Sequence, residues 1–260
     1  MSVVPQITTT ASSTVRNLLA DTVVDQTPAS VRSSVRVLYA PISGDAETTA
    51  HCRSVLSEPE LRRADSHATL EQRNNFIQRR AFRRYCAPLA LGLTSLAQIE
   101  FGETEKGRPY LLSDPHIWFS FSSCRSGILA AWSLTHAVGI DLEELETKCD
   151  AAELAREFFT EVEKTAVETA TGSERQRIFL QLWCLKEAAL KSVGEGLPFG
   201  LDAFEFELGR NTRVIDAPAK YGGAEGFRSH ILRISEAYAA LVIHRRETRM
   251  IGAPLPSLDA

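Results

Sequence analysis

The feature that most constrains the fold is a similar order of predicted strands and helices in the two halves of the chain. In the first half a strand begins at Val35, an amphipathic helix covers residues 69–91, and a strand pair covers residues 117–133. In the second half a strand at residues 138–143 precedes helices, and further strands follow up to residue 244. This order predicts an α+β fold built from two similar α/β lobes.

The composition of the ends separates them from these lobes. Residues 1–33 are polar and without a clear period, which predicts a disordered N-terminal extension. The predicted lobes cover residues 34–136 and 137–247, and a flexible tail covers residues 248–260. We therefore expect two lobes with a boundary near residue 137.

Short local signals place the helix ends. Ser57 with Glu60, and Thr160 with Glu163, have the spacing of capping boxes and predict helix starts. Glycines at the far ends predict helix stops, near Gly172 for the first helix of the second half and at Gly194 for the second.

Cysteine content, hydropathy and charge exclude several classes of protein. The five cysteines are widely spaced and form no C-x-x-C pair, which disfavours a disulfide framework or a zinc site and favours the cytoplasm. No apolar run reaches the roughly 20 residues of a membrane span. Residues 62–84 carry seven arginines against two acids, which indicates either a polyanion-binding face or a solvated helix surface. Nucleic-acid binding is disfavoured because this segment lacks aromatic stacking positions and a recognition motif.

The first candidate site is the strand VGIDLE at residues 138–143. Side chains two apart share one face of a strand, so Asp141 and Glu143 point together while Ile140 and Leu142 face the core. Two convergent carboxylates repel each other unless they lie in water or around a cation. The motif therefore indicates either a Mg²⁺ site or two solvated acids at a strand end.

The second candidate site is WCLKEAALK at residues 183–191, within a strongly apolar helix. Glu187 and Lys191 lie four residues apart on one helix face, with Trp183 one turn earlier. They form either an ordinary surface pair or a partly buried pair with a functional reason. Together, the two motifs supply three carboxylates and one ammonium, a set that could hold Mg²⁺ on a pyrophosphate and move a proton.

These motifs resemble those of the 4'-phosphopantetheinyl transferase superfamily, of the larger, surfactin-synthetase-activating type. G-[IV]-D-x-E, W-x-x-K-E-A-x-x-K and G-x-G-L are all present at the family's separation, and residues 158–163 resemble its F-F-x-x-x-E. Upstream, residues 56–64 and 107–109 also match family signatures. The resemblance covers roughly residues 35–245 and implies a pseudo-dimer of two lobes with the active site at their interface.

The resemblance implies a role for each matching residue. Asp141, Glu143 and Glu187 match the Mg²⁺ ligands, with Mn²⁺ as an alternative ion, and Glu187 also matches the proposed general base. Lys191 matches a lysine that contacts phosphate and assists the departing 3',5'-ADP, and Lys186 matches a motif lysine with a supporting role. The positions that match coenzyme A-binding residues are Arg63, Arg108, Ser122, Ser123 and Lys191, with Arg84 as a weaker candidate.

One position departs from the family pattern. The family's N-[IL]-S-H-S-x-G is replaced here by SFSSCRSG at residues 120–127, so Ser123 stands where the family has histidine. The resemblance implies that this histidine touches a coenzyme A phosphate. Ser123 could donate a neutral hydrogen bond, and Arg125 could supply the lost charge.

The resemblance implies a monomeric enzyme that moves the phosphopantetheine arm of coenzyme A to a serine of an apo acyl or peptidyl carrier protein. Carriers of fatty-acid, polyketide, nonribosomal-peptide and siderophore synthesis all fit. The departure at Ser123 keeps one alternative open, which is a non-catalytic binder of coenzyme A or of carrier proteins.

Overall fold

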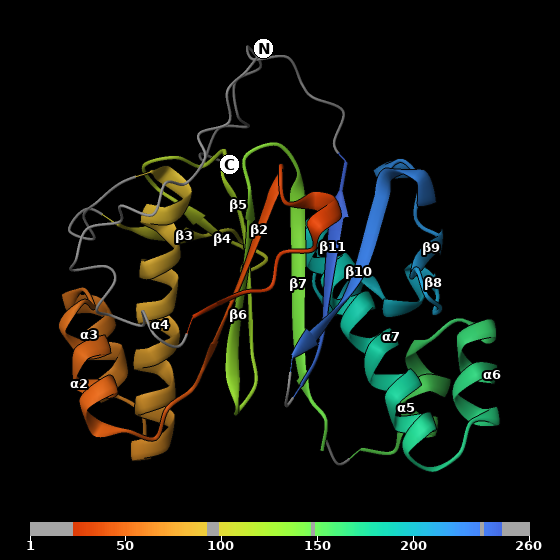
Figure 1. Cartoon of the computed structure of the whole chain (residues 1–260), viewed down its shortest axis with the longest axis horizontal. Helices are drawn as coiled ribbons and strands as arrows, with labels where there is room; N and C mark the ends of the chain where they lie inside the picture. The colour runs from red at the N-terminus through yellow and green to blue at the C-terminus, as the bar shows by residue number, and fades with distance from the viewer. Residues whose placement is uncertain (1–22, 93–98, 147–148, 235–236, 246–260) are drawn as a thin grey trace.

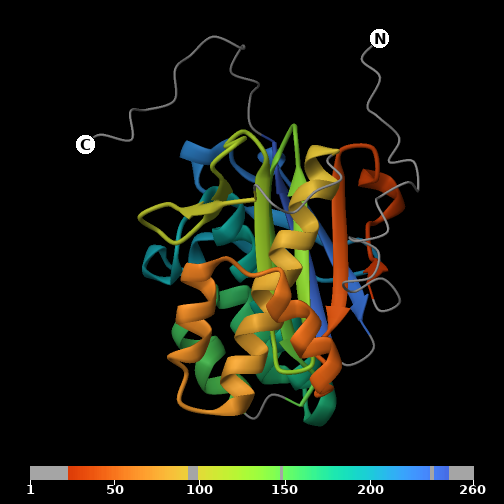
Figure 2. The same cartoon turned by 90° about the vertical axis from the view of Figure 1, so that its left-hand side faces the viewer.

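The computed structural model describes residues 23–92, 99–146, 149–234 and 237–245. Two antiparallel sheets stand face to face at the centre, and helices cover the outer face of each (Figure 1). The order of layers is helix, sheet, sheet, helix. A view turned by 90° places α4 in front of the first sheet, on the side away from the second (Figure 2).

The first sheet belongs to the N-terminal half and has the strand order β1-β2-β6-β5. Its strands are β1 (Val24–Asp25), β2 (Val35–Pro41), β5 (Trp118–Ser123) and β6 (Gly127–Ser133). Its helices are α2 (Ala46–Ser54), α3 (Glu58–Asp65) and α4 (Leu70–Leu91), and a small hairpin pairs β3 (Phe101–Glu103) with β4 (Pro109–Leu111).

The second sheet belongs to the C-terminal half and has the strand order β10-β11-β7. Its strands are β7 (Ala137–Glu144), β10 (Phe227–Ile234) and β11 (Ala237–His244). Its helices are α5 (Ala151–Phe158), α6 (Glu161–Thr169) and α7 (Gly172–Val193), and a hairpin pairs β8 (Glu205–Glu207) with β9 (Arg213–Asp216). Short 3-10 helices cover Ala29–Val31, Leu197–Phe199, Leu201–Ala203, Ala219–Tyr221 and Ala224–Gly226.

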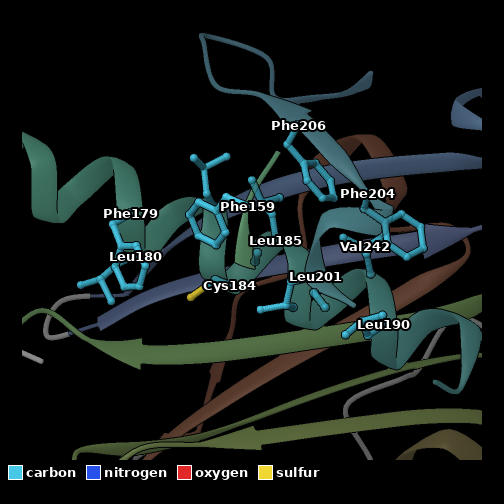
Figure 3. Close-up of a cluster of buried hydrophobic side chains, with 14 of the residues drawn as sticks. Phe159, Phe179, Leu180, Cys184, Leu185, Leu190, Leu201, Phe204, Phe206 and Val242 are labelled. Atoms are coloured by element: carbon cyan, nitrogen blue, oxygen red, sulfur yellow. The ribbon is translucent and has the colours of Figure 1, made fainter. Parts of the chain in front are cut away.

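Strand alternation divides the apolar side chains among three cores. On β7, Val138, Ile140 and Leu142 face the first sheet and join the core between the sheets. A second core lies between the first sheet and α4. The third lies between the second sheet and α7, where Phe159, Phe179, Leu185 and other buried side chains pack (Figure 3). The opposite face of β7 is therefore left to face α7.

Gly139 allows α7 to lie directly on that face of β7. A Cβ atom at this position would lie 1.8 Å from the carbonyl oxygen of Ala188 and 2.5 Å from the amide nitrogen of Ser192. Both atoms are backbone, so no side-chain movement could make room. Glycine here brings the next residues of the strand, Asp141 and Glu143, close to the helix.

Most of the predicted elements are confirmed, and two expectations are wrong. The predicted capping boxes at Ser57 and Thr160 are present, and Gly194 caps α7 with a φ of 75°. Gly172 does not end a helix: α6 stops at Thr169, and Gly172 begins α7. The predicted extension 1–33 is structured from residue 23, because β1 pairs with β2. The tail 248–260 lies outside the described residues.

The mixed helix and sheet architecture confirms the α+β class, while the relation of the two lobes as a pseudo-dimer stays a prediction. Within the described ranges, no helix combines the length and apolar character needed to cross a bilayer.

Candidate active site

The structure brings the two sequence motifs together at the contact between β7 and α7. Asp141 and Glu143 lie on the face of β7 that meets this helix. The charges of Asp141, Glu187 and Lys191 all act on the pKa of Glu143, and Trp183 donates a hydrogen bond to the Glu143 carboxylate. The structure thus pairs Lys191 with Asp141 and places Glu143 and Glu187 near enough for the charge of Asp141 to act on them, while the metal-binding and catalytic roles of these residues stay predictions.

Asp141 is the centre of this group, which we call the acid cluster: Asp141, Glu143, Glu187 and Lys191. Its side chain is buried, with 5% of its surface exposed. Its Oδ1 accepts hydrogen bonds from Lys191 Nζ at 2.6 Å and from Ser122 Oγ at 2.9 Å. Its Oδ2 is buried and accepts no hydrogen bond from an N–H or O–H group of the described residues, while the buried thiol of Cys184 lies next to the carboxylate. A buried carboxylate oxygen without a partner is costly unless a donor or a cation meets it.

The charges of the cluster shift the pKa values of its members. Burial raises the pKa of Glu143 from 4.5 to about 7, and the nearby Asp141 carboxylate adds to the rise. Burial and Asp141 also raise the pKa of Glu187. Burial alone would lower the pKa of Lys191, but the Asp141 and Glu187 carboxylates raise it above its ordinary value. The single ammonium of Lys191 therefore balances only part of the negative charge that the three carboxylates can carry.

The donor set fits a hard divalent cation. It offers carboxylate oxygens, including the unpartnered Oδ2 of Asp141, in a place where their mutual repulsion calls for positive charge. Among the described residues, no group of three or more His, Cys, Asp or Glu side chains is placed so that it could hold a metal ion. Mg²⁺ commonly uses only one or two carboxylates together with water and substrate phosphates, so three protein ligands are not required.

Ser122 connects the acid cluster to the first sheet. Its hydroxyl donates to Asp141 and accepts a hydrogen bond from Lys191 Nζ at 3.4 Å. Two residues earlier on β5, Ser120 Oγ accepts a hydrogen bond from the backbone N–H of Ile140 at 3.0 Å. Edge strand β5 of one sheet and edge strand β7 of the other therefore meet at the cluster.

The loop that departs from the family pattern lies next to these contacts. Arg125 is exposed and pairs with Glu144 at 3.4 Å, so its guanidinium is already engaged by a carboxylate. Sequence reasoning missed Arg79, whose Nη2 donates to the carbonyl oxygen of Cys124 at 3.5 Å and whose buried Nε has no partner. The arginine-rich face of residues 69–91 was the available signal for Arg79. Ser123 is half-buried at the end of β5.

The contacts given for the other arginines named from the sequence are with residues outside the acid cluster. Arg63 is exposed on α3. Arg84 is buried on α4 and pairs with Glu60 at 3.3 Å, which ties two helices of the N-terminal half. The guanidinium of Arg108 stacks on the ring of Trp118 at 3.9 Å. Their roles in coenzyme A binding stay predictions.

Lys186 serves a different purpose from its neighbour in the motif. Its side chain is fully buried, and its ammonium lies 2.6 Å from Glu163 Oε2. It also donates to the carbonyl oxygens of Phe204 and Leu201. Glu163 in turn accepts from Thr160 and from the backbone N–H of Phe206. This pair joins α6, α7 and the chain before β8, which gives the expected supporting role a structural basis.

Comparison with known proteins relates this site to a superfamily. Residues 137–247 match the 4'-phosphopantetheinyl transferase superfamily, a segment that contains the whole acid cluster. The chain is 31% identical over 147 residues to 4'-phosphopantetheinyl transferase HetI of Nostoc sp., covering 55% of this chain and 62% of that protein. It is 30% identical over 118 residues to 4'-phosphopantetheinyl transferase Sfp of Bacillus subtilis, covering 45% of this chain and 51% of that protein.

These matches confirm the resemblance predicted from the motifs. The chain spans less than two thirds of the length of these relatives, 62% and 51%. Activity, substrates and partners of the whole protein are accordingly matters of proposal.

Proposed function

Because residues 137–247 carry the domain of the 4'-phosphopantetheinyl transferase superfamily, we propose that this protein transfers the 4'-phosphopantetheine arm of coenzyme A to a serine of an apo carrier protein. The products are the holo carrier and adenosine 3',5'-bisphosphate. The observation that carries the proposal is the acid cluster, in which the buried Asp141 has one oxygen on Lys191 and the other without a partner.

Asp141 would be the principal ligand of Mg²⁺, or of Mn²⁺ in its place, with Glu143 and Glu187 beside it, and water and phosphate oxygens would supply the other ligands. When bound, the ion supplies positive charge to the pyrophosphate of coenzyme A and so stabilises the charge that develops during phosphoryl transfer. No Ser-His nucleophile is required within this chain, because the attacking oxygen belongs to the carrier serine.

Glu187 is the proposed general base. Its raised pKa lies closer to neutral pH than that of an ordinary glutamate, which makes it a better proton acceptor at that pH. It takes the proton of the carrier serine as the serine oxygen forms a bond to the β-phosphorus of coenzyme A. The bond from that phosphorus to the bridging oxygen breaks, and the electron pair leaves with the 3',5'-ADP.

Positive charge at the departing phosphate comes from the chain itself. Lys191 stays protonated because Asp141 and Glu187 raise its pKa, so it can stabilise the leaving phosphate. Arg79, held against the loop at Cys124, is our candidate for the charge that Ser123 cannot supply. Arg125 is less suitable because Glu144 engages it.

The test is to incubate the protein with coenzyme A, Mg²⁺ and an apo carrier, and to measure the mass gain of the carrier. Glu187→Gln should lower the rate by about 10²–10⁴-fold, the usual contribution of a general base. Glu71→Gln, on the exposed first turn of α4, is the matched control and should keep full activity. Binding of coenzyme A or the carrier without any mass gain would instead support the non-catalytic alternative.

We propose that the protein acts as a monomer and that it acts in the cytoplasm, where coenzyme A and apo carriers are both present. A panel of apo carriers from fatty-acid, polyketide, nonribosomal-peptide and siderophore synthesis would identify the pathway. The carrier with the highest kcat/KM is the expected partner.

A further inference from the structure

A large groove lies beside the acid cluster and plays no part in the chemistry proposed above. Its volume is about 1290 Å³, and it runs along β10 between the β8–β9 hairpin and the first turns of α7. His230 adds an imidazole, and the side chains among its described lining residues that carry charge near neutral pH are basic: Arg177, Arg210, Arg213, Arg228 and Arg233. We call this feature the arginine groove.

The charge of the groove is opposite to that of its surroundings. From His136 to the C-terminus the chain has fifteen Lys and Arg against twenty-one Asp and Glu. Five of those fifteen basic residues nevertheless line one groove, and no carboxylate is found among its described lining residues. Such local concentration of one sign creates a positive potential that attracts anionic groups.

Internal ion pairs neutralise only part of this charge. Arg177 pairs with Glu174, and Arg213 pairs with Glu207. Arg210, Arg228 and Arg233 are exposed and have no carboxylate partner among the described residues. Burial, and to a smaller extent the nearby Arg228, lower the pKa of His230, which therefore lines the groove as a neutral imidazole more readily than an ordinary histidine. Three unpaired arginines repel one another and give the fold no evident stability.

The strand register connects the arginine groove to the acid cluster. Glu143 of β7 lies opposite Tyr238 of β11, and Tyr238 lies opposite Arg233 of β10. The three side chains therefore share one face of the sheet, in a row that crosses the strands. Adjacent strands lie about 4.8 Å apart, so the backbone at Arg233 is about 10 Å from that at Glu143.

The groove also has features that favour a polypeptide over other anions. Its floor is partly apolar, with Leu208, Val214 and Leu232 among the lining residues. Strand β10 is an edge strand of its sheet among the described residues, so one side of its backbone has no strand partner. Among the described residues that line the groove, the aromatic ones are Phe227, which is buried, and Tyr238. A nucleic acid would need more exposed stacking surface.

We propose that the arginine groove docks an acidic surface of the carrier polypeptide whose serine enters the acid cluster. This inference rests on the proposed function and adds the place and the chemistry of partner recognition. Acidic side chains of the carrier pair with Arg233 on the sheet face shared with Glu143, with Arg210 of the β8–β9 hairpin, and with Arg228 on the opposite face of the edge strand β10. The backbone of Arg233 lies about 10 Å, two strand spacings, from that of Glu143, so the carrier serine can enter the acid cluster from this side. The transfer chemistry itself does not need the groove.

The test reverses the charge of the groove without touching the acid cluster. In Arg210→Glu/Arg233→Glu we expect KM for an acidic apo acyl carrier protein to rise at least about tenfold, which corresponds to about 1.4 kcal/mol. KM for coenzyme A and kcat at saturating carrier should stay within about twofold, because both arginines lie outside the acid cluster. The matched control is Arg62→Glu/Arg73→Glu, on α3 and α4, which makes the same change in net charge and should leave both KM values unchanged.

A binding measurement separates this inference from the proposed function. The probe is the same carrier with its acceptor serine replaced by alanine, titrated at low and at moderate salt. Weaker binding to the groove variant alone, with a smaller salt dependence, supports docking even if no transfer is found. Equal carrier binding and equal KM in groove variant and control would overturn the docking inference while leaving the transfer activity intact. The docking inference would also be overturned if the groove variant lost binding to RNA but kept the binding of the carrier.

Discussion

Two lysines of α7, Lys186 and Lys191, make nearly identical ion pairs with opposite consequences. Each ammonium lies 2.6 Å from a buried carboxylate, Glu163 for Lys186 and Asp141 for Lys191. The Lys186 pair is closed: both side chains are buried, and backbone and hydroxyl groups complete the hydrogen bonds of both partners. The Lys191 pair is open, because the lysine is 32% exposed and Asp141 keeps one oxygen without a partner.

The difference shows what separates a structural ion pair from a reactive one. The charges of the two pairs are the same and their separations are equal, but Lys186 is fully buried whereas Lys191 is 32% exposed. What also differs is the unused bonding capacity and the neighbouring charge, since Glu143 and Glu187 crowd Asp141. A fully satisfied pair stabilises one conformation, whereas a pair with an unsatisfied oxygen and excess negative charge can bind a cation and a phosphate.

The largest expected effect on stability comes from breaking the closed pair. Lys186→Met leaves Glu163 as an unpaired buried charge and should lower the free energy of unfolding by about 3–5 kcal/mol. Chemical denaturation at pH 7 measures this loss. The double variant Glu163→Gln/Lys186→Met removes both charges and should recover part of it. A loss below about 1 kcal/mol in the single variant would contradict the structural role, because that is the range of exposed pairs.

The next effect comes from separating α7 from β7, the contact that the Lys191–Asp141 pair spans. In Gly139→Ala the new Cβ meets the carbonyl oxygen of Ala188, and neither backbone can yield locally. We expect a loss of about 1–3 kcal/mol, as is usual for overpacking, together with reduced transfer activity. Gly44→Ala is the control, because its Cβ would meet no atom within 4 Å. Wild-type stability and activity in Gly139→Ala would show that the close approach is dispensable.

A smaller effect is expected when the open pair is broken. Asp141→Asn leaves Lys191 partly hydrated, so unfolding in the presence of a chelator should change by at most about 1 kcal/mol. The stabilisation by Mg²⁺, about 1.4 kcal/mol at a concentration ten times Kd, should vanish. Thermal unfolding with and without Mg²⁺ measures both. An unchanged response to Mg²⁺ would exclude Asp141 as a ligand.

The sequence predicted the elements of the site better than its surroundings. Period-2 and helical patterns placed β7 and α7, and the motif spacing identified Asp141, Glu143, Glu187 and Lys191 as candidates. The predictions of β7 and α7 succeeded because they depend on neighbours along the chain, while the roles of the four residues stay predictions. The same local reasoning failed at Gly172, where a glycine typical of a helix stop instead begins the next helix.

Long-range contacts could not be read from the sequence in the same way. Arg79 reaches Cys124 only because α4 packs near the end of β5, and Arg125 was favoured because it is adjacent to Ser123 in sequence. The arginine groove combines residues from α7, the β8–β9 hairpin and β10 that no motif connects. The partner of Lys186 is likewise 23 residues away, and only the fold shows that the pair is closed.

The smallest expected effect tests the charge balance of the open pair through pH. The folded protein keeps a proton on Glu143 up to about pH 7, whereas an unfolded glutamate loses it near 4.5. Because the folded state binds more protons between these values, its stability should fall as pH rises through this window. Glu143→Gln removes this contribution, so its unfolding free energy in chelator should depend less on pH between about 4.5 and 7. Glu71→Gln, exposed on α4, should keep the wild-type slope. Equal slopes in wild type and Glu143→Gln would mean that the cluster carries no excess negative charge at Glu143.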